Sequence, residues 1–135
     1  MIEQILYTAL MMCLMVVIHT YWSIHILGII PTIKPLRKSI FFILIRISVS
    51  MLSVHFIEAI IFALFYYFRS GFDSIEIALY YSITSYATVG FGDTLLPCNL
   101  QIIGAAEGLI GILLCGWTVA LLSGFLKYLK LDISE

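Results

Sequence analysis

The segment TVGFGD, residues 88–93, places two glycines at alternate positions inside a very apolar chain. Glycine lacks a Cβ atom and adopts positive φ angles at little steric cost, so Gly90 and Gly92 allow successive backbone carbonyls to turn to the same side. Such a column of oxygens can replace the water shell of a dehydrated monovalent cation. The segment therefore predicts coordination of a cation by the backbone itself.

Three ionisable residues, His55, Glu58 and Glu107, lie in apolar stretches, where burying a charge is costly and marks a functional candidate. His55 and Glu58 are three residues apart, so on a helix they share one face and can pair. One interpretation is structural, with Glu107 as a buried, hydrogen-bonded strut. The sharper hypothesis is that all three support residues 88–93 from behind and make the cation-binding function of this segment depend on pH. An unchanged pH response in the Glu107→Gln and His55→Gln variants would contradict it.

Other reactive side chains carry weaker signals. His19 and His25 stand among aromatic and polar residues near one end of the first apolar segment, a pattern more typical of interfacial anchoring than of a metal or proton site. The cysteines, Cys13, Cys98 and Cys115, are odd in number and imply no disulfide framework, although Cys98 could bind a soft metal. We find no nucleophile elbow, phosphate-binding loop or local metal-ligand spacing, so the sequence predicts neither an enzyme nor a cofactor.

Composition defines the surroundings of these residues. Of 135 residues, 62% are hydrophobic and 11% are charged, and the mean hydropathy is +1.11. A soluble domain carries about a quarter charged residues, so this chain is predicted to lie in a lipid bilayer. The net charge of −1 gives no reason to expect a nucleic-acid partner, and the sequence identifies no soluble protein partner.

The apolar segments predict an all-α integral membrane fold. A spanning helix needs about 20 apolar residues. Three stretches are long enough: residues 5–30, 39–68 and 100–127. Residues 73–87 are too short to span and precede the glycines, so we expect a re-entrant half-helix followed by a loop. The predicted organisation has three parts: an N-terminal helix with a basic linker (1–38), two helices with the half-helix and loop between them (39–127), and a short tail (128–135).

Basic side chains set the predicted orientation. They gather in the connection of residues 31–38 and after the last helix, at Lys127 and Lys130, whereas the opposite side carries only Arg69. The positive-inside rule then places both basic groups, and with them the C-terminus, in the cytoplasm. We expect a multi-pass protein of the cell membrane, plasma or inner, with the N-terminus and residues 88–93 toward the outside.

Placed between two spanning helices, TVGFGD resembles the selectivity filter of potassium channels, which reads T-V-G-[Y/F]-G-D. The resemblance also covers Tyr80 and Tyr81, which stand where such pores carry an aromatic cuff. It extends to the order of segments: outer helix (39–68), pore helix (73–87), filter (88–93) and inner helix (100–127). The chain is most similar to small bacterial ion-channel proteins with an extra transmembrane helix before a two-helix pore.

The resemblance implies a role for each filter residue. Carbonyl oxygens would coordinate K⁺ at Thr88, Val89, Gly90 and Phe91, joined by the Thr88 hydroxyl, while Gly92 completes the filter and Asp93 forms the outer mouth. One chain supplies one strand and the family's filter needs four, so a homotetramer is implied, with the conduction path on its four-fold axis. K⁺ would be the transported ion and not a cofactor.

Two residues depart from the familiar filter pattern. Phe91 has no hydroxyl, by which a tyrosine at that position ties the filter to the pore helix. Thr84 stands where several bacterial pores have a glutamate that pairs with the aspartate, here Asp93. The departures bear on the support of the filter, for which Thr84 stays a candidate, and leave the carbonyl column intact.

Glycines in the last helix have two interpretations. Gly104, Gly108 and Gly111 recur at helical spacing around Glu107 and favour close packing against another helix. Gly111 and Gly116 also stand where related inner helices carry a hinge glycine, since glycine weakens a helix locally. From the sequence, packing and bending are equally good explanations.

The predicted function is a potassium-selective ion channel. It is not gated by a voltage sensor of the arginine-rich kind, because no helix carries a ladder of arginines and Arg46 stands alone. Two alternatives remain, a less selective monovalent cation channel and a non-conducting membrane scaffold or subunit. Ion flux and reversal potentials distinguish the three.

Overall fold

The computed structural model describes the backbone of residues 2–29 and 39–133 and the side chains of residues 2–28 and 40–127. The basic connection predicted at residues 31–38 and the last two residues of the predicted tail lie outside this part. Within it, every regular element is an α-helix: α1 (Ile2–Ile29), α2 (Ser39–Phe68), α3 (Ile75–Tyr86) and α4 (Gln101–Ile133). The predicted all-α fold is confirmed.

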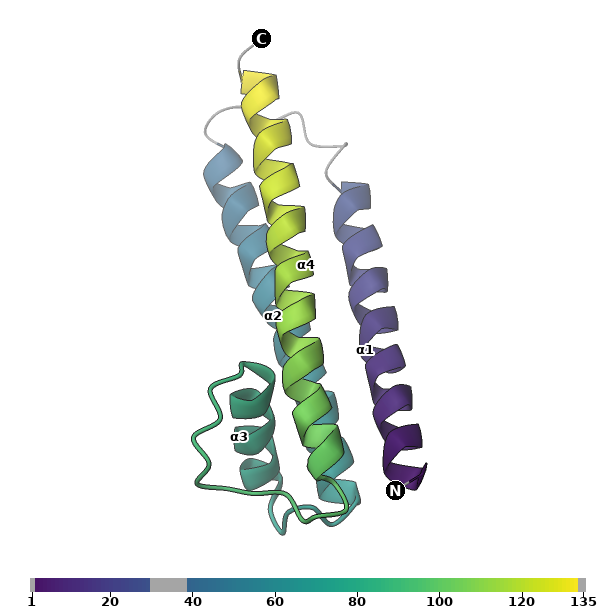
Figure 1. Cartoon of the computed structure of the whole chain (residues 1–135). Helices are drawn as coiled ribbons and strands as arrows, with labels where there is room; N and C mark the ends of the chain where they lie inside the picture. Colours follow the sequence, from purple (N-terminus) through teal and green to yellow (C-terminus); the bar gives the residue numbers. More distant parts are fainter. Residues whose placement is uncertain (1, 30–38, 134–135) are drawn as a thin grey trace.

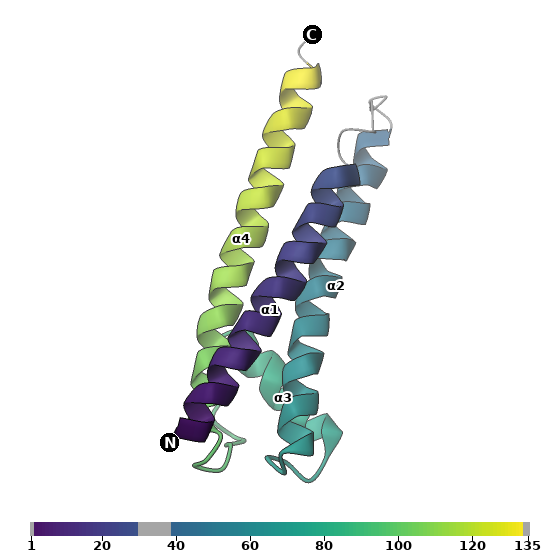
Figure 2. The ribbon, with the colours of Figure 1, turned by 90° about the vertical axis from the view of Figure 1, so that its right-hand side faces the viewer.

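Three of these helices, α1, α2 and α4, are long and apolar enough to cross a membrane. They run side by side, while the short α3 packs against α2 and α4 at one end of the bundle (Figures 1 and 2). The loop after α3 passes along the outside of that helix before it enters α4 (Figure 1). The fold is therefore three transmembrane helices with a re-entrant helix and loop between the second and the third.

Local sequence sets the helix ends. Ser74 caps α3: its hydroxyl accepts a hydrogen bond from the backbone N–H of Glu76 at 3.2 Å, and the Glu76 carboxylate complements the helix dipole. The helix therefore starts after Ser74 and not at the predicted residue 73. At the other end of the chain, α4 continues to Ile133, beyond its predicted end at residue 127. Most of the predicted tail is thus helical, because leucine and lysine are strong helix formers and neither glycine nor proline follows Gly124.

The start of α1 lies at the same end of the bundle as α3 and its loop (Figure 1). Arg69, just after α2, donates a hydrogen bond to Glu3 at 2.8 Å, and its guanidinium lies 4.6 Å from the centre of the Tyr7 ring. The Gln4 amide donates to the Cys98 carbonyl at 3.5 Å. These contacts fix the N-terminal helix to the end that carries residues 88–93.

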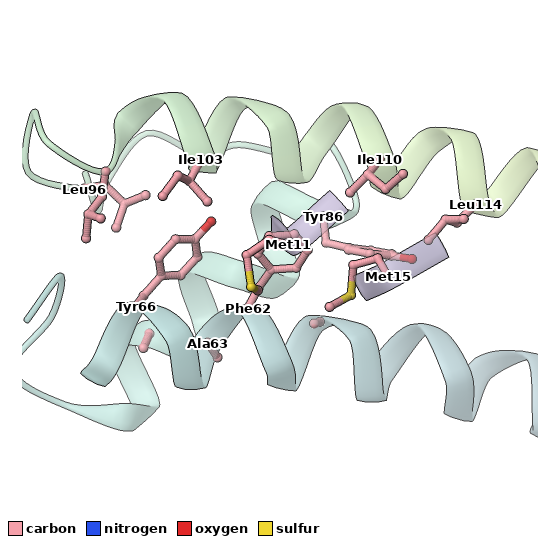
Figure 3. Packing of buried hydrophobic residues seen from close by; sticks show 13 residues of the cluster. Met11, Met15, Phe62, Ala63, Tyr66, Tyr86, Leu96, Ile103, Ile110 and Leu114 are labelled. Atoms are coloured by element: carbon pink, nitrogen blue, oxygen red, sulfur yellow. The ribbon is translucent and has the colours of Figure 1, made fainter. Parts of the chain in front are cut away.

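The hydrophobic core lies in the half of the bundle that holds α3 (Figure 3). Met15 of α1, Phe62 and Tyr66 of α2 and Ile103 of α4 are completely buried in one cluster. Lipid tails are as apolar as these side chains, so in a bilayer the cluster holds the helices together by van der Waals packing and not by the hydrophobic effect. The core therefore holds α3 against two spanning helices and so positions the loop that follows it.

Candidate functional site

The backbone of residues 88–92 alternates between two conformations. Thr88, Gly90 and Gly92 have positive φ angles of 59°, 52° and 76°, whereas Val89 and Phe91 do not. The expected positive φ angles of Gly90 and Gly92 are confirmed. A positive φ costs a residue with a Cβ atom about 1–2 kcal/mol, so Thr88 is held in a strained conformation by its surroundings.

Backbone N–H groups of this segment turn back toward α3. That of Thr88 donates to the Ser85 carbonyl at 2.9 Å, and those of Val89 and Gly90 both donate to the Thr84 carbonyl, at 2.9 and 3.1 Å. Among the residues that the structure describes, none donates a hydrogen bond to the carbonyls of residues 88–91. The segment therefore presents free oxygens and few free N–H groups, an arrangement suited to a cation and not to an anion.

Residues 87–93 are all exposed in the single chain, and Phe91 keeps 69% of its surface. Non-helical backbone at membrane depth is stable only against protein or a water-filled path. Further protein chains or a water-filled path must therefore cover the side of the bundle that carries this segment.

Tyr80 contacts both Phe91 and Asp93 and so connects α3 to residues 88–93, although Phe91 and Thr84 lack the polar groups that make such a connection in the familiar filter pattern. Its ring stacks on Phe91, with centroids 6.5 Å apart and an angle of 8° between the planes. Its hydroxyl donates to Asp93 Oδ2 at 2.8 Å, and this bond to a carboxylate raises the pKa of the Tyr80 hydroxyl above its ordinary value. The Thr84 hydroxyl instead donates within its own helix, to the carbonyls of Tyr80 and Tyr81. Thr84 thus holds the segment through its carbonyl, and Tyr80 is the partner of Asp93.

Glu107 of α4 is completely buried behind α3. Its Oε2 accepts a hydrogen bond from the Tyr66 hydroxyl of α2 at 2.7 Å, and its Oε1 lies 2.5 Å from the Ser82 hydroxyl of α3, which also lies 2.7 Å from the Ala59 carbonyl of α2. A buried polar group left without its partner costs about 1–3 kcal/mol. Glu107 is thus the buried strut of the structural interpretation, and it joins three helices.

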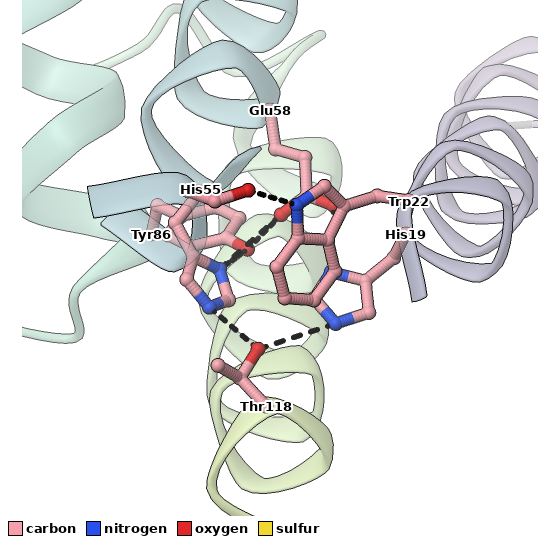
Figure 4. Close-up of polar contacts among 7 residues, drawn as sticks. His19, Trp22, His55, Glu58, Tyr86 and Thr118 are labelled. Atoms are coloured by element: carbon pink, nitrogen blue, oxygen red, sulfur yellow. Dashed lines mark hydrogen bonds and ion pairs between the residues drawn. The ribbon is translucent and has the colours of Figure 1, made fainter. Parts of the chain in front are cut away.

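Glu58 of α2 is the centre of a second buried cluster (Figure 4). Its Oε1 lies 3.0 Å from Nδ1 of His19, and its Oε2 lies 3.3 Å from Nδ1 of His55 and 2.5 Å from the Tyr86 hydroxyl. Beyond the two imidazoles, Thr118 Oγ1 lies 3.2 Å from Nε2 of His19 and 2.9 Å from Nε2 of His55. All four helices contribute a side chain to this cluster.

These five side chains form a closed ring of contacts. It runs from Glu58 to His19, Thr118, His55 and Tyr86, and the last contact returns to Glu58. One proton in each of the five contacts completes the ring, with the proton between Glu58 and His19 held by either the carboxyl group or the imidazole. The ring then carries no net charge, which suits a position inside the membrane.

The three ionisable residues predicted as one cluster are divided between two. His55 and Glu58 pair as predicted, at 3.3 Å, whereas Glu107 bonds to Tyr66 and Ser82. Support of residues 88–93 and proton sensing by these residues stay predictions.

The interpretation of His19 as an interfacial anchor is wrong, because its side chain is completely buried; His25 is exposed. The search for metal-ligand spacing along the sequence missed the contact of His19 with Glu58, because the two are 39 residues apart. The only signal was the presence of an ionisable side chain in an apolar segment.

Three glycines of α4, Gly104, Gly108 and Gly111, face α3. A Cβ atom at Gly108 would lie 3.2 Å from the Ser85 carbonyl oxygen, and one at Gly111 would overlap the Tyr86 carbonyl, whereas one at Gly116 would have no neighbour within 4 Å. Helix α4 is continuous through these positions. Packing therefore explains Gly111, while a hinge at either glycine stays a prediction.

A family model described as an ion channel matches residues 50–128, more than half of the chain. The chain belongs to this ion-channel family. The match covers most of α2, all of α3 and the loop, and most of α4, which is the part that resembles a two-helix potassium-channel pore. Together with the three membrane-length helices, this match identifies a multi-pass membrane protein of ion transport. Membership of an ion-channel family does not suggest an enzyme. No curated protein and no solved structure matches the chain significantly.

Proposed function

We propose that four copies of this channel protein form a potassium-selective pore, in which carbonyl oxygens of Thr88, Val89, Gly90 and Phe91 coordinate dehydrated K⁺ on a four-fold axis. The observation that carries the proposal is the alternating backbone of residues 88–92, in which the N–H groups of Thr88, Val89 and Gly90 bond to α3 while the oxygens of residues 88–91 accept no hydrogen bond from the described residues. Several neutral oxygen dipoles in a row bind a monovalent cation strongly enough to dehydrate it and weakly enough to release it.

The exposure of residues 87–93 in the single chain supports the assembly of several copies around this segment. Residues 87–93 are uncovered in the single chain, and α1 lies on the side of the bundle away from them (Figure 1). The side that carries the segment is thus open to other copies, and the extra N-terminal helix does not obstruct it. A closed ring of four identical strands covers each strand with its neighbours and leaves an axial path for ions.

A pair of glycine variants tests the role of the carbonyl column. Gly90→Ala and Gly28→Ala both place a methyl group where no atom lies within 4 Å, but only Gly90 has a positive φ, of 52°. In liposomes with a potassium gradient, flux through Gly90→Ala should fall about 5–30-fold, because the new side chain disfavours this backbone by about 1–2 kcal/mol. Gly28→Ala, on α1, should keep the parent flux.

The outcomes separate the alternatives. Equal flux through both variants would contradict coordination by the backbone. No flux from a parent protein confirmed as a tetramer by native mass spectrometry would favour a non-conducting scaffold. Where flux is present, reversal potentials in mixed sodium and potassium solutions distinguish a potassium-selective channel from a less selective one.

We also propose that the N-terminus and residues 88–93 face the outside of the cell membrane. The distribution of lysine and arginine supports this orientation. Cys98 is exposed in the loop that follows residues 88–93, so it reports the side. With Cys13 and Cys115 replaced by serine, a membrane-impermeant thiol reagent should label Cys98 in intact cells. Labelling only after permeabilisation would reverse the orientation.

A further inference from the structure

Ligand-type side chains converge in the ring around Glu58, which contains no residue of the segment 88–93 (Figure 4). His19, His55 and Glu58 each offer one atom able to ligate a metal, and these atoms all lie within 4.8 Å of one another. The side chains of His19 and Glu58 are completely buried, while that of His55 keeps 18% exposure in the single chain. The three ligands come from two helices, α1 and α2.

We propose that His19, His55 and Glu58 bind a divalent transition-metal ion of the zinc class. Two imidazole nitrogens and a carboxylate oxygen are a donor set that such ions take in proteins. The carboxylate oxygens of Glu58 lie 3.0 and 3.3 Å from the two Nδ1 atoms. A tetrahedral site with bonds of about 2.0–2.2 Å has edges of about 3.3–3.6 Å, so both contacts lie within a few tenths of an ångström of that spacing. The ligand atoms of all three residues lie within 4.8 Å of one another, and side-chain movements bring them around the ion.

Thr118 holds the two imidazoles in the orientation that the site needs. Its oxygen lies 2.9 and 3.2 Å from the two Nε2 atoms and has lone pairs for two N–H donors. When both Nε2 atoms carry the proton, both Nδ1 lone pairs face Glu58, and outer partners of this kind fix ligating histidines in metal sites. The rings of Trp22 and Trp117, centred 5.3 and 5.7 Å from that of His19, flank the cluster.

Without metal, hydrogen-bonding protons lie between the imidazole nitrogens and the Glu58 carboxyl group. The metal ion would replace these protons at the same position. A bound ion joins α1 to α2 directly. It also restrains Glu58, which accepts a hydrogen bond from Tyr86 at the end of α3. Binding of the ion does not depend on the proposed conduction.

Zinc chloride titrated into the purified full-length chain in detergent tests the site. Cys13, Cys98 and Cys115 are first replaced by serine, because exposed thiols bind zinc themselves. We expect saturable binding of one zinc ion per chain. His19→Gln should abolish it, and His25→Gln, which changes an exposed histidine of the same helix, should leave it unchanged.

Two further measurements keep the test decisive if His19→Gln fails to fold. Zinc-edge X-ray absorption of the cysteine-free chain with native histidines should show nitrogen and oxygen neighbours that include imidazole. Thr118→Val keeps all three ligands and should weaken binding about 10–100-fold. No saturable binding, or equal affinity in His19→Gln, overturns the proposal. Flux with and without zinc is recorded separately, so an absence of flux contradicts the proposed conduction and leaves the metal site standing.

Discussion

Helix α3 has a front face, which contacts the proposed filter (residues 88–93), and a back face, which contacts α2 and α4. The hydrogen bonds on the two faces differ in burial. On the front, the Thr84 carbonyl and the Tyr80 side chain bond to the filter in half-buried and exposed positions. On the back, the hydroxyls of Ser82 and Tyr86 bond to two completely buried glutamate side chains. An exposed group that loses its partner can bond to water instead, whereas a buried group left without its partner costs about 1–3 kcal/mol. The front therefore sets the shape of the filter, and the back sets the position of the helix.

The largest effect is expected where α4 meets the back of α3. In Gly111→Ala the added methyl group overlaps the Tyr86 carbonyl, and the two helices must separate. Overpacking of this kind should lower the free energy of unfolding by about 3 kcal/mol, read from denaturant titrations in detergent. Gly116→Ala is the control: it meets no atom within 4 Å and should gain about 0.8–1.0 kcal/mol from helix propensity. Equal stability of the two variants would contradict the close contact.

Tyr86→Phe should have the next largest effect. The substitution keeps the ring in the core and removes the hydroxyl that donates to Glu58, which leaves a buried acceptor without one of its partners. We expect a loss of about 2 kcal/mol in the free energy of unfolding. Its matched control on the front is Tyr80→Phe; an equally large loss there would remove the distinction between the faces.

Tyr80→Phe should change selectivity more than stability. The ring still stacks on Phe91, but the exposed bond to Asp93 is lost, so unfolding should change by less than about 1 kcal/mol. The loss frees the outer end of the filter to move, and the preference for K⁺ over Na⁺ should fall. Reversal potentials measure this directly, and an unchanged preference would limit Tyr80 to a packing role.

Thr84→Val should have the smallest effect. The hydroxyl that it removes bonds only to carbonyls of the same helix, and the Thr84 carbonyl that accepts from Val89 and Gly90 is backbone. Stability should stay within about 0.5 kcal/mol of the parent, with the same reversal potential. A clear loss of selectivity would instead assign filter support to the Thr84 side chain.

Much of the fold could be predicted from the sequence, because a helix that spans a membrane must be apolar over about 20 residues. Apolar length alone places the second helix at residues 39–68, and α2 runs from Ser39 to Phe68. The conformation of Gly90 and Gly92 could also be predicted, because the requirement for a positive φ is local. The contact between His19 and Glu58 could not, since the spanning helices are apolar on all faces and no periodicity shows which face turns inward. The partnership of Tyr80 with Asp93 likewise depends on the path of the whole loop.

The ring around Glu58 also bears on the order of events during membrane insertion. Thr118 lies on α4 and Tyr86 lies on α3, and both helices are synthesised after α1 and α2. A partly made chain that ends after α2 holds His19, His55 and Glu58 in lipid without these two partners, at a cost that favours delay near the translocation machinery. We therefore expect the arrival of α3 and α4 to favour release of α1 and α2 into the bilayer.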